Sequence, residues 1–109
     1  MYEYNATLIR IVDGDTVWVD VDLGLDIHHQ IDLRLYGINA PEMKTKAGQD
    51  SRAHLVELMQ GAGSLVIQTE KDRTEKYGRY LATLLLGGMN INQQMVTDGF
   101  AVPFMVGRT

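Results

Sequence analysis

The first third of the chain shows the alternation of apolar and polar positions that is typical of strands. One strand is predicted over residues 6–12, a second over 17–22, where three valines alternate with Trp and Asp, and a third over 31–35. Asp13-Gly14 predicts a tight turn between the first two strands, and residues 24–29 predict a longer turn before the third. In the third strand the alternation places Arg34 on the face opposite Leu33 and Leu35.

The spacing of apolar residues changes after a polar, basic loop that runs through residue 48. Leu55, Leu58, Met59 and Ala62 recur at the intervals of one buried helix face, which predicts a helix from Asp50 to about Ala62. Two further strands are predicted over 65–71 and 80–86, separated by a charged loop over 72–79.

A short second helix is predicted after the last strand. Asn90 or Asn92 supplies its N-terminal cap, and Gly99 ends it in a left-handed conformation. The order of three strands, a helix, two strands and a helix does not suit a parallel sheet, which needs a crossover between most strands. We therefore expect one domain over 1–109, mainly β with some α, built as a five-stranded antiparallel OB-fold barrel with two packed helices.

Composition narrows the class of protein. The chain has no cysteine, so a disulfide framework and a thiolate zinc site are excluded. The sequence shows no signal peptide or membrane-spanning segment, and a cytoplasmic location is the default expectation. With 14 acidic and 10 basic residues, the net charge of -4 argues mildly against a protein that wraps a polyanion. A local cationic site remains compatible with that balance.

Candidate chemistry begins at the first turn. Asp13-Gly14-Asp15 places two carboxylates together, and carboxylate oxygens are the hard ligands that calcium and magnesium prefer. Because Asp-Gly is also a very common turn sequence, this segment alone favours the structural interpretation over the metal interpretation.

Two segments that contain arginine make a catalytic interpretation more favourable than the turn alone does. In residues 34–42 a strand delivers the Arg34 guanidinium, and the following loop delivers Asn39 and the Glu42 carboxylate. Arginine suits phosphate because its planar fork donates two parallel hydrogen bonds and stays charged. Taken alone, Arg34 fits a solvated salt bridge equally well, and the charged loop that ends at Arg79 fits a solvated face. Together, however, these groups are the parts that phosphoryl transfer needs.

The three segments resemble the staphylococcal nuclease-like (thermonuclease) family. The resemblance covers about residues 6–101, and its specific pieces are Asp-Gly-Asp-Thr-Val at 13–17, Arg34-Leu35 with Pro41-Glu42, and Lys-Tyr-Gly-Arg at 76–79. It implies a nucleic-acid substrate and calcium-dependent hydrolysis of DNA or RNA, with the 5′ oxygen as leaving group and a 3′-phosphate as product.

The resemblance also assigns roles to particular residues. It implies that Arg34 and Arg79 bind the phosphate and that Glu42 acts as base on the attacking water. The implied calcium ligands are Asp15, Asn39 and the backbone carbonyl of Ala40, and the implied nucleotide contacts are Lys76 and Tyr77. Asn39 stands where the family usually has an aspartate that binds the metal, so a weaker calcium affinity is expected.

Other interpretations stay open at this stage. A nuclease-like barrel that has lost catalysis and binds nucleic acid or protein is the main alternative, favoured by Asn39 and by the acidic balance. An assembly role is a third, suggested only by the apolar tail over 100–106, which also lacks the tyrosines of secreted family members. His28 and His29 are expected in a solvated turn, without a metal. The sequence does not fix the oligomeric state, and a monomer is the working assumption.

Overall fold

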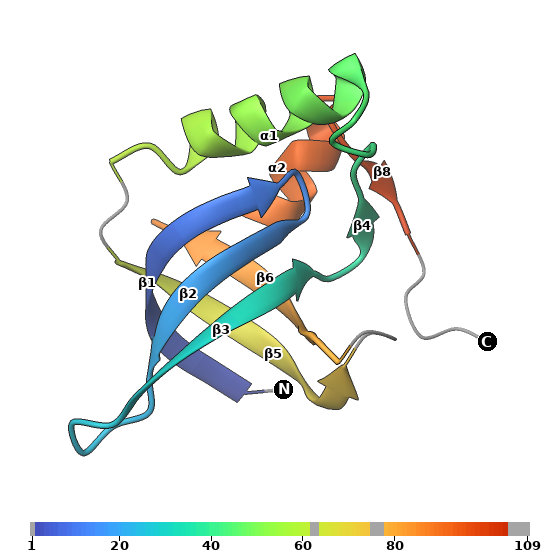
Figure 1. Ribbon diagram of the computed structural model, residues 1–109. Helices are drawn as coiled ribbons and strands as arrows, with labels where there is room; N and C mark the ends of the chain where they lie inside the picture. The colour runs from blue at the N-terminus through green and yellow to red at the C-terminus, as the bar shows by residue number, and fades with distance from the viewer. Residues whose placement is uncertain (1, 62–63, 75–77, 105–109) are drawn as a thin grey trace.

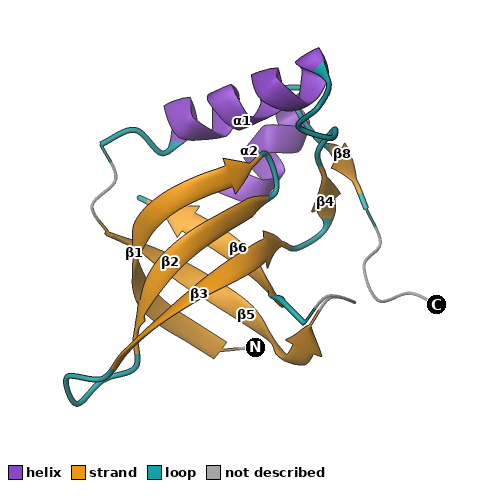
Figure 2. Cartoon of the chain, in the orientation of Figure 1, coloured by secondary structure: helices purple, strands orange, loops and turns teal. Residues whose placement is uncertain are grey.

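The computed structural model describes residues 2–61, 64–74 and 78–104. Five long strands and two helices make up most of this part of the chain (Figures 1 and 2). The long strands are β1 (Tyr2–Asp13), β2 (Thr16–Asp22), β3 (His28–Leu35), β5 (Ser64–Thr74) and β6 (Tyr80–Leu86). Short strands are β4 (Ile38–Asn39), β7 (Met89–Asn90) and β8 (Val102–Pro103), and the helices are α1 (Lys46–Leu58) and α2 (Ile91–Thr97).

The long strands close into a barrel, as the sequence predicts. Going round it, β3, β2, β1, β5 and β6 are neighbours, and β6 returns to β3. All of these pairings are antiparallel except the closing pair, β3 with β6, which is parallel. The expectation of a purely antiparallel barrel was therefore wrong in this detail. The reason is geometric, because a ring with an odd number of strands cannot alternate direction at every contact.

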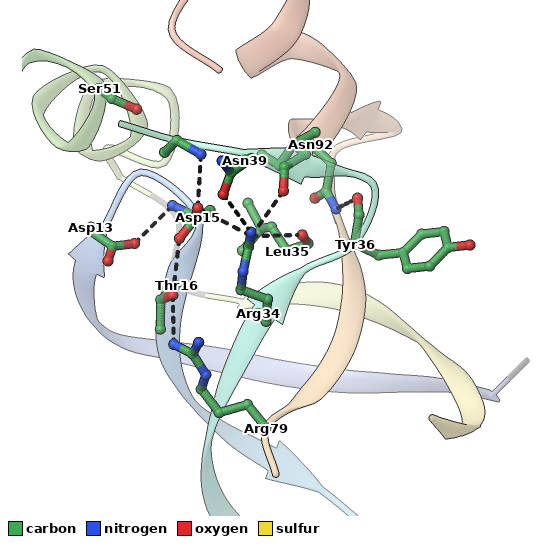
Figure 3. Close-up of polar contacts among 12 residues, drawn as sticks. Asp13, Asp15, Thr16, Arg34, Leu35, Tyr36, Asn39, Ser51, Arg79 and Asn92 are labelled. Atoms are coloured by element: carbon green, nitrogen blue, oxygen red, sulfur yellow. Dashed lines mark hydrogen bonds and ion pairs between the residues drawn. The ribbon is translucent and has the colours of Figure 1, made fainter. Parts of the chain in front are cut away.

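The barrel interior contains the apolar rows that the alternation marks. Val17, Val19, Leu33 and Leu35 are fully buried in the core. Arg34 lies outside that core cluster, on the opposite side of β3, as expected. Its side chain is instead directed to the region where β3 meets β4 and the turn between β1 and β2 (Figure 3).

Helix α1 begins earlier than the sequence analysis predicts, at Lys46 rather than Asp50. Thr45 caps it, because its side chain accepts a hydrogen bond from the Gly48 backbone N–H at 3.0 Å. The polar first turn hid this start, and Lys46 in fact bonds to Asp50 along the helix at 2.8 Å. The expected end at Ala62 falls outside the described residues, and the helix ends at Leu58.

Helix α2 is capped by Asn90, whose side chain accepts from the Gln93 N–H at 3.0 Å. Asn92 has a different function. It is buried, and it donates to the Tyr36 and Ala82 carbonyls and accepts from the Leu84 N–H. This one amide therefore fastens α2 to the ends of β3 and β6. Gly99 ends the helix with a positive φ of 84°, as expected.

The link between β2 and β3 is shorter than predicted. His28 and His29 belong to β3, where they pair with Asp22 and Val21, so their expected place in a turn was wrong, whereas their expected exposure to solvent is confirmed. The alternation was hidden because two polar histidines occupy successive positions.

Neither helix in the described part of the chain has the length and apolar character to cross a bilayer.

Candidate active site

The turn between β1 and β2 is held in a fixed shape by its own aspartate. Asp13 Oδ1 accepts a hydrogen bond from the Asp15 backbone N–H at 3.0 Å, and Asp13 pairs with Thr16 across the turn. Gly14 packs so closely that an added Cβ would collide with Ser51 on α1 and with Ala40. Glycine is therefore required here because the turn lies directly against the helix and the loop after β4.

Asp15 is the centre of the polar contacts in Figure 3. Its side chain is buried, and Oδ2 accepts from the Ala40 N–H at 2.8 Å and lies 3.2 Å from Arg34 Nη1. Its other oxygen, Oδ1, accepts from the Thr16 hydroxyl at 3.2 Å. The carboxylate thus connects the first turn to β3 and to the loop after β4.

The environment of Asp15 opposes ionisation. Burial, followed by the hydrogen bond and charge of the neighbouring Asp13, raises the pKa of Asp15 from 3.8 to about 6. The Ala40 N–H and the Arg34 guanidinium act in the opposite direction and offset part of this effect. A carboxyl group held in this way is easier to ionise when a further positive charge comes close.

Arg34 is fixed by acceptors from several directions. It donates through Nη1 to the Ile38 carbonyl at 2.9 Å and through Nη2 to Asn39 Oδ1 at 2.9 Å. It also contacts its neighbour's carbonyl, Leu35 O, at 3.3 Å. Arg34 is 8% exposed, and these contacts hold its guanidinium in one position at the edge of the interior.

The Arg79 side chain reaches the same turn from the start of β6, the strand that pairs with β3. Arg79 lies just before β6, and its Nη1 donates to Thr16 Oγ1 at 3.1 Å. Because Thr16 also donates to Asp15, a continuous polar chain runs from Arg79 through Thr16 and Asp15 to Arg34 (Figure 3). The structure therefore brings together two arginines that lie 45 positions apart in the sequence.

The proposed calcium ligands also lie next to one another. Asp15 Oδ2 accepts a hydrogen bond from the Ala40 N–H. Arg34 contacts both side chains of this set, since it donates a hydrogen bond to Asn39 Oδ1 and forms an ion pair with Asp15 Oδ2. Carboxylate, amide and backbone carbonyl oxygens are the donors that calcium takes, so this set fits that ion in chemistry. The set holds one carboxylate, with Asp13 nearby. No group of three acidic, His or Cys side chains suited to a metal is found among the described residues.

Glu42 is placed differently from the other predicted residues. Its side chain is 72% exposed, and in the described part of the chain its ion pair is with Lys44, at 3.2 Å. Its backbone is nevertheless fixed, because its carbonyl accepts from the Thr45 hydroxyl at 2.6 Å and lies against Gly48. The structure thus holds the Glu42 main chain near the site but directs the carboxylate to solvent. Lys76 and Tyr77 fall outside the described residues.

Two residues at the site were not singled out from the sequence. Thr16 was quoted only as part of a motif, although its hydroxyl joins Asp15 to Arg79. Phe104 lies with its ring centre 6.0 Å from Arg34 Cζ and is 46% exposed, and its N–H donates to the Gly37 carbonyl at 2.8 Å. No local pattern marks either residue, since both act through partners that are distant in the sequence.

Comparison with known proteins shows which family the chain resembles. Residues 32–108 match the family model described as staphylococcal nuclease homologue. An uncharacterized endonuclease of Escherichia coli is 34% identical over 100 residues, which cover 91% of this chain and 60% of the relative. The prophage-derived endonuclease YokF of Bacillus subtilis is 32% identical, covering 89% of this chain and 33% of the relative. The thermonuclease of Staphylococcus hyicus is 28% identical, covering 91% and 59%. The chain therefore spans at most about three fifths of the length of these relatives.

Proposed function

This chain belongs to the staphylococcal nuclease homologue family, and we propose that it hydrolyses phosphodiester bonds of DNA or RNA at the Arg34, Asp15, Thr16 and Arg79 cluster. The relatives named as endonucleases support cutting within a strand. The observation that carries the proposal is that two guanidinium groups contact the same turn, Arg34 at Asp15 and Arg79 at Thr16. This arrangement suits the binding of a phosphate better than it suits the stabilisation of a barrel.

The two arginines supply positive charge where the reaction needs it. Attack on a phosphodiester places negative charge on the non-bridging oxygens, and donors that are already oriented stabilise that charge without further reorganisation. Arg34 is oriented by Ile38, Asn39 and Asp15, and Arg79 by Thr16. Their planar forks suit a phosphate with two oxygens to offer.

Room for a substrate exists beside two of the proposed calcium ligands, although neither arginine lines it. A groove of about 410 Å³ borders Asn39 and Ala40 and lies between α1 and residues 99–102. Phe104, next to Arg34, presents a partly exposed ring. The groove walls carry little charge apart from Asp50, so they suit bases or sugars better than further phosphates.

Asp15, Asn39 and the Ala40 carbonyl would hold a calcium ion at this site. A bound calcium ion would polarise a phosphate oxygen and orient water. Arg34 already forms an ion pair with Asp15 Oδ2 and donates a hydrogen bond to Asn39 Oδ1, and Asp15 is the one carboxylate among these three ligands. Weak calcium affinity is therefore part of the proposal.

Glu42 completes the proposal as the base on the attacking water. Among the described residues its exposed carboxylate forms a solvent-screened ion pair with Lys44, and giving up that pair to turn toward a bound substrate costs little. Catalytic contacts commonly tighten only in the presence of substrate. In this scheme the 5′ oxygen leaves and a 3′-phosphate remains.

The test is a cleavage assay on single-stranded DNA and RNA with calcium, with magnesium and with a chelator. Calcium-dependent cutting that yields 3′-phosphate ends is expected. No cutting at high protein concentration under any of these conditions would overturn the proposal. In that outcome, binding of the same oligonucleotides without cleavage would favour a nuclease-like binding module, which the exposed position of the Glu42 carboxylate would then explain.

A further inference from the structure

A separate cavity of about 280 Å³ is lined by residues at the starts of β1, β3 and β6 and at the end of β2. Figure 1 shows these strand ends at the end of the barrel away from α1. The floor of the cavity consists of apolar side chains from the barrel interior, including Val21, Ile31 and Ile67. The cavity is not lined by the described residues of the proposed nuclease site, which are Asp15, Thr16, Arg34, Asn39, Ala40, Glu42 and Arg79. This barrel mouth is therefore an independent feature, and its chemistry is not explained by phosphodiester hydrolysis.

Three tyrosines surround the barrel mouth. Tyr2 and Tyr4 come from the start of β1, and Tyr80 comes from the start of β6. The Tyr2 and Tyr4 ring centres are 6.5 Å apart with a tilt of 37°, so their faces are not stacked on one another. Tyr2 is 48% exposed and Tyr80 is 45% exposed. Burying such large rings in the core would stabilise the fold more than this exposure does. The rings are thus available to a ligand.

In the part of the chain whose side chains the structure describes, the charged residue that lines the barrel mouth is acidic. Glu70 lines the cavity, and His29 is the other titratable group in its wall besides the tyrosines. The adjoining ribbon of β2 and β3 carries Asp20, Asp22, Asp26 and Asp32, and it has no Lys or Arg from position 20 to 33. These four aspartates equal the net charge of the whole chain, which is -4. A phosphate-bearing ligand is disfavoured here, and a cation is favoured.

We propose that the barrel mouth binds an alkylated ammonium group, such as that of choline or of a methylated lysine side chain. The faces of tyrosine rings attract organic cations, the apolar floor accepts methyl groups, and the Glu70 carboxylate balances the charge. An unmodified ammonium is more strongly hydrated and gains less from such a site. A nucleobase would also stack on the rings, and its amino group can donate to the carboxylate, so nucleosides are tested below as competitors.

The discriminating experiment compares choline with the neutral analogue dimethylbutanol, in which a tert-butyl group replaces the trimethylammonium group. The two ligands have nearly the same shape, so the difference reports the charge. NMR titration of the full chain should show choline shifting signals of Tyr2, Tyr80 and Ile31, with an affinity about five- to tenfold higher than that of the analogue. Equal affinity for the two, or no shift at these residues, would overturn the proposal.

Variants locate the binding. Tyr2→Leu and Glu70→Gln should each weaken choline binding several-fold, whereas Tyr80→Phe should retain it because the ring face remains. Tyr36→Leu is the matched control, since Tyr36 lies outside the barrel mouth. Unchanged binding in both Tyr2→Leu and Glu70→Gln, with folding verified by circular dichroism, would contradict the assignment.

Two further ligands distinguish the source of the cation. A short peptide with trimethyllysine that binds more tightly than choline would identify a partner protein, whereas equal affinity would point to a small molecule. The same peptide with unmodified lysine should bind more weakly than the trimethylated one. Adenosine or thymidine that competes with choline and binds more tightly would overturn the proposal in favour of a nucleobase site. None of these readings requires nuclease activity.

Discussion

Arg34 Nη1 lies 3.2 Å from Asp15 Oδ2, and each of the two side chains is only 10% exposed. A pair this well shielded from solvent leaves a costly uncompensated charge when one partner is removed. The pair also joins β3 to the turn between β1 and β2, which places both groups beside Asn39 and Ala40. Binding, charge and local structure therefore depend on the same contact.

Arg34→Ala should lower the rate of phosphodiester cleavage by about 100- to 1,000-fold, because it removes a donor oriented toward the phosphate. Arg34→Lys should restore only part of the rate, since lysine keeps the charge without the planar fork. The rates are measured on single-stranded DNA at saturating calcium. Arg10→Ala removes the same charge at an arginine near Trp18 and should leave the rate nearly unchanged. Equal losses in Arg10→Ala and Arg34→Ala would show that only net charge matters.

Thr16→Val should lower the cleavage rate by about tenfold, because the hydroxyl that orients Arg79 and bonds to Asp15 is lost while the shape is kept. Thr16→Ser retains the hydroxyl and should keep most of the activity. In the double variant Thr16→Val with Arg79→Ala, the loss should be close to that of Arg79→Ala alone. Full additivity of the two losses would mean that Thr16 does not act through Arg79.

Asn39→Asp should lower the calcium concentration needed for half-maximal cleavage, because it adds a second full negative charge beside Asp15. Asn90→Asp adds the same charge at the start of α2, away from these ligands, and serves as the control. Calcium titration of the cleavage rate is the measurement. An unchanged calcium requirement in Asn39→Asp would argue that this side chain does not face the ion.

Asp15 should make the stability of the metal-free chain depend on pH. Because burial raises its pKa to about 6, the folded state binds this proton more tightly than the unfolded chain does. Its contribution to the free energy of unfolding is therefore present at low pH and is lost as the pH rises from about 4 through about 6. Asp15→Asn cannot titrate, so the stability of the wild type relative to this variant should fall over that interval. Urea unfolding in the presence of a chelator measures the difference, and a rise with pH would contradict the raised pKa.

Gly14→Ala should destabilise the fold by about 1–3 kcal/mol, because the new Cβ collides with Ser51 and Ala40. It should also lower the cleavage rate, since the displaced turn carries Asp15. Adding Ser51→Ala removes one obstacle and should recover part of the stability. A Gly14→Ala variant as stable and as active as the wild type would show that the turn adjusts freely.

Local pattern was sufficient for most of the fold. The strands, both helices, the Asn90 cap and the Gly99 ending could be predicted, because alternation, capping and backbone freedom act over a few neighbouring residues. The start of α1 at Lys46 and of β3 at His28 could not, because polar residues there follow no apolar period. Helix α1 begins where Thr45 caps it, and β3 begins where His28 pairs with Asp22 of β2.

By itself, the sequence determined the barrel class, the face of Arg34 and the segments that belong to a nuclease family. Only the tertiary structure decided how those segments meet. It linked Arg34 to Arg79 through Asp15 and Thr16, directed the Glu42 carboxylate to solvent, and raised the pKa of Asp15 by burial. The physical reason is that hydrophobic periodicity is a short-range property of the chain, whereas hydrogen bonds, ion pairs and desolvation depend on which distant residues share a place in space.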